Sequence, residues 1–139
     1  MRIALFLSAA LLSTASSAAS SAVEGRWVNP KRSVVMIIAP CGVDLMCGTV
    51  AWASDQAKAD ARKGTDALVG AQLLSDFAPK APGQWQGKLF IPDKNMWVTA
   101  RIILGSDDRL KVTGCAILCM SQHWTRLIEP APTNYVKGR

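Results

Sequence analysis

The sequence has little of what enzymes use to move protons, because it contains a single histidine, His123, and 10 acidic residues. Nucleophilic catalysis needs a base within reach of the nucleophile. On an extended strand, His123 points away from the face that carries Trp124 and Arg126. No Asp or Glu falls on the strand faces that we expect to point inward, which argues against a paired-carboxylate site. We therefore predict no catalytic residue and a protein that is not an enzyme.

The sequence also lacks a glycine-rich loop that would cradle a phosphate and a dinucleotide-binding fingerprint. Its four cysteines are not spaced as zinc ligands usually are, and the histidine lies outside them. Asp93, Asp107 and Asp108 fall in turns, where Asp typically bonds to the backbone. We expect neither a cofactor nor a metal.

The first 22 residues have the pattern of a secretory signal peptide, with Arg2 before a short apolar run and a small-residue stretch that ends at Ala22. The apolar run is too short for a permanent membrane helix. Removal of residues 1–22 leaves 117 residues, with 15 Lys and Arg against 10 Asp and Glu, a net charge of +5. The pattern predicts an exported, periplasmic protein with one domain at residues 23–128 and a mobile tail at 129–139.

Eight segments show the alternation or the β-branched composition of strands. They are residues 25–28, 33–39, 45–53, 68–74, 84–91, 96–104, 109–114 and 122–128. Residues 55–63 break this pattern and predict a short surface helix or an ordered loop, while 68–74 also fits a helix. Short turns join most of the strands, and eight strands suffice to close an up-and-down barrel. We therefore predict a mostly-β fold, a small eight-stranded antiparallel barrel with one short helix.

Four cysteines in a small exported domain predict two disulfides. Cys41 and Cys47 bracket one turn, and Cys115 and Cys119 bracket another. In an eight-stranded meander these turns lie at opposite ends of the barrel, farther apart than the 7 Å or so that disulfide α-carbons allow. Pairing within each hairpin, Cys41–Cys47 and Cys115–Cys119, is therefore expected.

Four different short motifs follow one another along the chain. They are Gly25-x-Trp27, Cys41-Gly42 through Cys47-Gly48, Gly114-Cys115, and Cys119-x-Ser121-Gln122-x-Trp124-x-Arg126. Together they resemble the DUF2147 family of exported bacterial proteins, over most of the chain that follows the signal peptide. Residues 57–70 depart from the family's pattern, which usually has an Asn-Pro stretch and a Leu-Arg-x-Arg-Pro-Leu-like run there. The resemblance implies a calycin-like barrel and brings no established catalytic residues.

A looser similarity concerns the two ends of the domain. Lipocalins also begin with Gly-x-Trp and end with an Arg that lies on that Trp, and Trp27 and Arg126 stand where such a pair is expected. A stacked pair of this kind stabilises a fold by about 0.5–2 kcal/mol. The alternative is that Trp27 is an ordinary core residue and Arg126 a solvated charge at a strand end.

Two functions without catalysis fit these features. In the first, the inner wall of the barrel encloses a small apolar ligand. The predicted wall is Met46, Val50, Trp52, Trp85, Leu89, Met96, Val98 and Ile102. Space would come from Gly48, Gly87, Gly114 and Ala100; the alternative is a core filled by its own side chains.

In the second function, a structural or interaction protein binds an anionic component of the cell envelope through a basic outer face. That face would comprise Arg26, Lys88, Arg101, Arg109 and Lys111, together with the helix from Lys58 to Lys63. The alternative is an ordinary solvated basic surface. Export argues against a nucleic acid as the partner.

Overall fold

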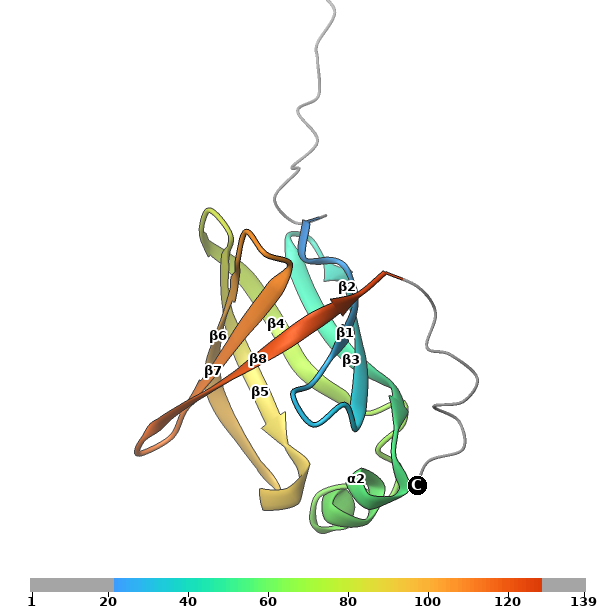
Figure 1. Cartoon of the computed structure of the whole chain (residues 1–139). Helices are drawn as coiled ribbons and strands as arrows, with labels where there is room; N and C mark the ends of the chain where they lie inside the picture. Colours follow the sequence, from blue (N-terminus) through green and yellow to red (C-terminus); the bar gives the residue numbers. More distant parts are fainter. Residues whose placement is uncertain (1–21, 129–139) are drawn as a thin grey trace, which may run out of the picture.

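A computed structural model of the chain describes residues 22–128 and has the form of a closed barrel (Figure 1). The strands are β1 (Gly25–Val28), β2 (Val34–Gly42), β3 (Leu45–Ala53), β4 (Gln72–Ala81), β5 (Gln84–Ile91), β6 (Met96–Leu104), β7 (Arg109–Cys115) and β8 (Cys119–Leu127). Each strand pairs antiparallel with the next in sequence, and β1 pairs with β8 to close the ring. The predicted eight-stranded antiparallel barrel is confirmed. The predicted signal peptide up to residue 21 and the predicted tail at 129–139 lie outside the described residues.

One short helix, α2 (Asp55–Asp60), continues into the 3-10 helix η1 (Ala61–Lys63) after β3. Ser54 caps its start, since the Ser54 hydroxyl accepts a hydrogen bond of 3.1 Å from the Ala57 backbone N–H. Ala57 and Ala61 pack against the core, so the helix lies over one end of the barrel. No helix within residues 22–128 is long and apolar enough to cross a lipid bilayer.

The bounds predicted for the fourth strand were wrong, because β4 starts at Gln72 and runs to Ala81. Gly70 has φ of +90° and belongs to the turn before the strand. Asp76 has φ of +54°, and the pairing register with β5 shifts between Ser75 and Ala78. This bulge lets the strand continue where the sequence resembles a loop.

Apolar side chains from all the strands fill the barrel, and among the described residues no polar or charged residue is buried. The largest fully buried side chains are Trp27, Trp85, Phe77, Met36, Ile38, Met46, Leu74, Ile102, Leu110, Val23, Val28 and Val50. Burial of one such side chain stabilises the fold by about 1.5–3 kcal/mol.

Two disulfides, Cys41–Cys47 and Cys115–Cys119, each span one hairpin turn, as predicted. Their α-carbons are 5.6 Å and 4.1 Å apart. The β2–β3 turn and the β7–β8 turn lie at opposite ends of the barrel (Figure 1). Each bridge closes a short loop, which in chain-entropy terms stabilises the fold by about 2 kcal/mol.

The space beside two inward-facing glycines is occupied by large neighbours. A Cβ at Gly48 would lie 2.6 Å from the Met36 sulfur and 2.9 Å from the Leu74 side chain. A Cβ at Gly87 would lie 2.7 Å from both Phe77 Cδ2 and the Ser75 carbonyl oxygen. These two glycines therefore admit neighbouring core side chains and leave no room for a ligand.

Gly87→Ala tests this packing. We expect a loss of about 1–3 kcal/mol in the free energy of unfolding, because the added methyl meets the Phe77 ring and the Ser75 backbone carbonyl, each at 2.7 Å. Gly42→Ala is the matched control, since its nearest neighbour would be the mobile Leu45 Cδ1 at 3.3 Å. Urea denaturation measures both; equal stability of the two variants would contradict the packing described.

Candidate functional site

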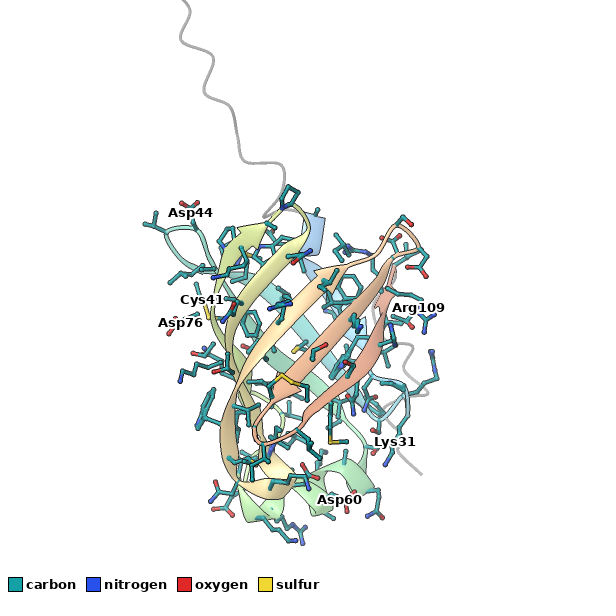
Figure 2. All side chains as sticks on the ribbon, turned by 90° about the vertical axis from the view of Figure 1, so that its left-hand side faces the viewer. Lys31, Cys41, Asp44, Asp60, Asp76 and Arg109 are labelled. Carbon is teal, nitrogen blue, oxygen red and sulfur yellow. A yellow bond between two sulfur atoms is a disulfide. The ribbon has the colours of Figure 1, made fainter. Side chains whose placement is uncertain are left out.

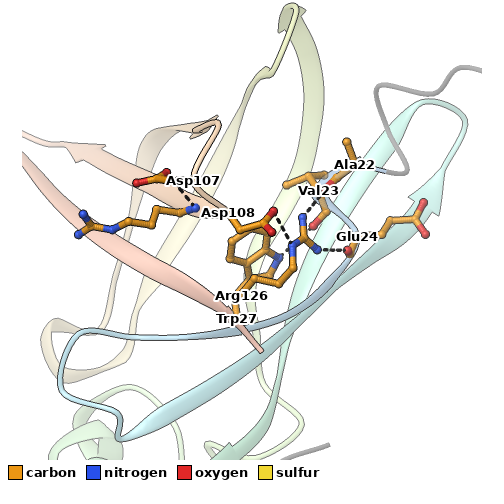
Figure 3. Close-up of polar contacts among 8 residues, drawn as sticks. Ala22, Val23, Glu24, Trp27, Asp107, Asp108 and Arg126 are labelled. Atoms are coloured by element: carbon orange, nitrogen blue, oxygen red, sulfur yellow. Dashed lines mark hydrogen bonds and ion pairs between the residues drawn. The ribbon is translucent and has the colours of Figure 1, made fainter. Parts of the chain in front are cut away.

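The two ends of the domain meet where Arg126 of β8 lies over Trp27 of β1 (Figure 3). The guanidinium carbon is 4.3 Å from the centre of the indole ring. Its Nη1 donates to the Glu24 carbonyl at 2.8 Å, and its Nη2 donates to the Ala22 carbonyl at 2.5 Å. Its Nε donates to the Asp108 carboxylate at 3.2 Å. Arg126 is therefore a structural clamp, as the lipocalin similarity implied.

The Gly-x-Trp motif has a geometric reason at this clamp. Gly25 has φ of +136°, a backbone conformation that L side chains rarely adopt, and a Cβ there would lie 2.9 Å from Arg126 Nη1. Two residues on, the Trp27 indole N–H donates to the Val23 carbonyl at 3.0 Å. The motif thus makes room for the guanidinium and orients the ring beneath it.

Seven of the eight predicted wall residues face the barrel interior. Met46, Val50, Trp85, Val98 and Ile102 are buried there, and Leu89 and Met96 are half-buried.

Trp52 is the exception, because the pairing of β2 with β3 shifts by one residue at Ala51. Val50 pairs with the inward-facing Met36, whereas Trp52 pairs with Val35, the next residue along β2. Paired residues share a face and successive residues alternate, so Trp52 lies on the outer face. The prediction that Trp52 lines the interior was wrong.

The inward face of β8 passes from core to solvent along its length. Trp124 is buried, but Gln122 and Met120, on the same face, are exposed, Met120 by 75%. β1 pairs with β8 only over Thr125–Leu127, so no described strand flanks the first half of β8 on that side. We call this part of the barrel, lined by Leu89, Met96, Val98, Gly114 and Met120, the open end.

One polar atom inside the barrel is left without a partner. Among the side-chain nitrogen and oxygen atoms buried within residues 22–128, the Trp85 indole nitrogen forms no hydrogen bond. An unpaired buried donor of this kind costs the fold about 1–3 kcal/mol.

The outer faces of β5, β6, β7 and β8 carry four exposed cations and no acid. Register places Lys88 opposite Thr99, Arg101 opposite Thr113, and Lys111 opposite Ile103 and His123. Arg109, labelled in Figure 2, pairs with Thr125 at the far end of the same face. We call Lys88, Arg101, Arg109 and Lys111 the basic face.

The other predicted basic residues lie apart from this face. Arg26 is half-buried on β1, beyond β8, and the cations from Lys58 to Lys63 belong to α2 and η1 at the end of the barrel. His123 is exposed on the outer face beside Lys111, as its position in the sequence predicted.

Two further features of the described residues offer chemistry. A surface hollow of about 640 Å³ lies outside the barrel, between Ala59, Asp60, Arg62, Lys63, Asp93 and Lys94. The Cys41 and Cys47 sulfurs and an Asp76 carboxylate oxygen lie within 4.8 Å of one another (Figure 2). Those sulfurs are bonded to each other and offer no thiolate, so this group is a poor metal site.

A family model described as "Uncharacterized protein conserved in bacteria (DUF2147)" matches residues 25–126. The chain belongs to this family. The match runs from the Gly-x-Trp motif to the Arg that clamps it, so the DUF2147 domain coincides with the barrel. No curated protein sequence matches the chain.

Among solved structures, the DUF2147 chain is similar to protein HP1028 from the human pathogen Helicobacter pylori, which is described as belonging to the lipocalin family. The TM-score is 0.61 and the sequence identity 14%, over 84% of this chain and 90% of the other. The likeness shows a lipocalin-like fold, in agreement with the calycin-like barrel that the family resemblance implied.

A double-mutant cycle tests the clamp. We expect Arg126→Gln to lower the free energy of unfolding by about 2 kcal/mol, because it removes the stacked cation and its bonds to the β1 segment. Combined with Trp27→Leu, the losses should fall short of additivity by about 0.5–2 kcal/mol. Arg109→Gln, an exposed change on the same hairpin, is the control and should cost less than about 0.5 kcal/mol. Strictly additive losses would contradict the contact.

Proposed function

We propose that this DUF2147 protein is an exported binding protein without catalytic activity, which holds a small apolar ligand at the open end of its barrel. The observation that carries the proposal is the solvent exposure of inward-facing residues on β8, next to the half-buried Leu89 and Met96. Apolar side chains that face a barrel interior and still reach solvent are a usual setting for a small-molecule site.

The chemistry of the open end favours an apolar ligand. Its lining is aliphatic and carries no charge. The unpaired Trp85 N–H lies outside the open end, because Trp85 pairs with Ile102 and the space beside Gly87, between Trp85 and Leu89, is filled. The lipocalin-like fold supports the same class of function.

The position proposed for the ligand differs from the centre of the barrel. The side chains of Met36, Leu74 and Phe77 fill the space beside Gly48 and Gly87, so the part of the interior around these two glycines is occupied. Met46, Val50 and Ile102 are then part of the packed core. Leu89, Met96 and Val98 remain as the predicted wall residues that a ligand would touch.

Export to the periplasm is the setting that we propose for this binding. Two disulfides fit an oxidising compartment, and the first 22 residues have the pattern of a signal peptide.

Met120→Asp tests the ligand site. Met120 is exposed, so the change should leave stability intact, but a carboxylate at the open end should weaken binding of the neutral apolar probe N-phenyl-1-naphthylamine at least tenfold. Fluorescence titration measures the affinity. Val43→Asp is the matched control, since Val43 is exposed in the opposite stapled turn.

Native mass spectrometry of the protein recovered from its own periplasm should detect a bound small molecule of low polarity. An unliganded protein that also fails to bind the probe would refute the proposal. Probe binding unaffected by Met120→Asp would place the site elsewhere.

A second candidate function, binding to an anionic envelope component, is favoured by the absence of acids on the basic face. Lys88, Arg101, Arg109 and Lys111 give this face one sign of charge, which attracts polyanions over about a Debye length, 8–10 Å at physiological salt.

Arg101→Gln combined with Lys111→Gln tests the basic face. We expect weaker retention on a sulfated-dextran column, with elution at a lower salt concentration than wild type, because exposed charges act through screened attraction. The control is Lys31→Gln with Lys58→Gln, which removes the same charge from the β1–β2 loop and α2. Equal elution of the two double variants would dismiss the basic face as a binding surface.

A further inference from the structure

The turn between β7 and β8 holds large aliphatic side chains out in solvent. Ile117 is 99% exposed and Leu118 is 79% exposed. The Cys115–Cys119 disulfide closes the turn, and the Ala116 N–H donates to the Leu118 carbonyl at 3.2 Å. Turns in water are usually built from Gly, Asn, Asp, Ser or Pro. Folding of the barrel does not bury these two side chains, so a disulfide-closed loop presents them to the surroundings.

Trp97 extends this apolar surface on the neighbouring strand. Thr99 pairs with Cys115 at the end of the β6–β7 ladder, and the strands are antiparallel, so Trp97 lies two residues past the last pair, in the direction of the β7–β8 turn. Trp97 is 52% exposed and packs on Phe90, with ring centres 5.0 Å apart. Exposed Trp side chains are favoured at the level of lipid headgroups, because the ring is apolar and its N–H is polar. We call Ile117, Leu118 and Trp97 the apolar tip.

The basic face begins directly behind the apolar tip. Lys88 lies two residues from Phe90 on the outer face of β5, and Arg101 and Lys111 follow in the next rows. The nearest described acid in sequence to Trp97 is Asp93, which is followed by Lys94 in the 3-10 helix η2 (Pro92–Lys94). Asp107 and Asp108, in the β6–β7 turn, lie at the other end of the basic face, away from the apolar tip.

We infer that the apolar tip and the basic face together dock the protein on an anionic lipid bilayer. The tip enters the boundary between headgroups and acyl chains, and Lys88, Arg101 and Lys111 meet lipid phosphates. This inference deepens the second function proposed above, because it names the anionic partner and uses the same cations. A soluble polyanion would engage the cations alone and would leave Ile117 and Leu118 in water, so the pairing of the two surfaces favours lipid.

Ile117→Ser combined with Leu118→Ser tests the tip by co-sedimentation with vesicles. The exported, disulfide-bonded protein should bind vesicles of phosphatidylcholine with about one-third phosphatidylglycerol, and bind pure phosphatidylcholine at least tenfold more weakly. The tip variant should bind the anionic vesicles about tenfold more weakly than wild type, through loss of apolar burial. Val43→Ser, in the opposite stapled turn, should bind as wild type does. Wild type and the variants differ only at the substituted residues, so a difference in vesicle binding reports the effect of the substitution.

Brominated lipid provides a second readout. Quenching of tryptophan fluorescence by bromines high in the acyl chains should be present in wild type and reduced in Trp97→Phe. Arg101→Gln with Lys111→Gln should lower vesicle affinity by about an order of magnitude at low salt. Its control is Lys31→Gln with Lys58→Gln.

The remaining outcomes overturn the inference in separable ways. One such outcome is weaker retention of Arg101→Gln with Lys111→Gln on sulfated dextran, while Ile117→Ser with Leu118→Ser leaves vesicle affinity unchanged. This would reject docking on lipid but support the basic face as a binding surface. In another outcome, wild type forms a dimer in analytical ultracentrifugation, Ile117→Ser with Leu118→Ser is monomeric, and neither binds vesicles. The apolar tip would then contact a second copy of the protein and not a bilayer. Absence of both vesicle binding and polymer retention would reject the basic face as well.

Discussion

The barrel closes where two distant parts of the chain meet, and there Arg126 stacks on Trp27. Every other ladder joins strands that follow each other in sequence, and the pairing of β1 with β8 is the one that turns the strip of strands into a ring. That pairing involves three residue pairs, because β1 has four residues. A guanidinium suits the role, since it stacks by its flat face and still donates hydrogen bonds from its edge to the carbonyls of the β1 segment.

The same short β1 divides the interior into two parts. Where β1 lies between β2 and β8, Trp27 and Trp124 are buried and the core is packed. Past Val28, β8 continues without a described neighbour on that side, and its inward side chains reach solvent. The fold thus combines a packed core at one end with inward-facing side chains that reach solvent at the other.

Local patterns in the sequence predicted what local geometry determines. Alternation and β-branched composition located seven strands, although they placed the start of β8 three residues late, and spacing identified both disulfides. The motifs at the two ends of the domain identified Trp27 and Arg126, because lipocalins join their ends in the same manner. The outward position of His123 followed from its alternation with Trp124.

The errors arose where register or packing between separate strands decides the outcome. A bulge at Ala51 turns Trp52 outward, and a positive φ at Asp76 carries β4 through a loop-like stretch; alternation within one strand reveals neither. The room expected beside Gly48 and Gly87 is filled from β2 and β4, whose approach depends on the closed barrel. Met120 was missed because the strand starts earlier than predicted, although continued alternation from Trp124 would have found it.

The two disulfides have a consequence for how the chain folds and oxidises. They join cysteines six and four residues apart, each within one hairpin. In an unfolded chain, loops of this size close in tens of nanoseconds or so, far more often than longer ones. The correct partner is therefore also the nearest one, and oxidation needs no prior tertiary structure. Each bridge can therefore form in the unfolded chain or after the ring has closed, and neither has to be broken for the first and last strands to meet.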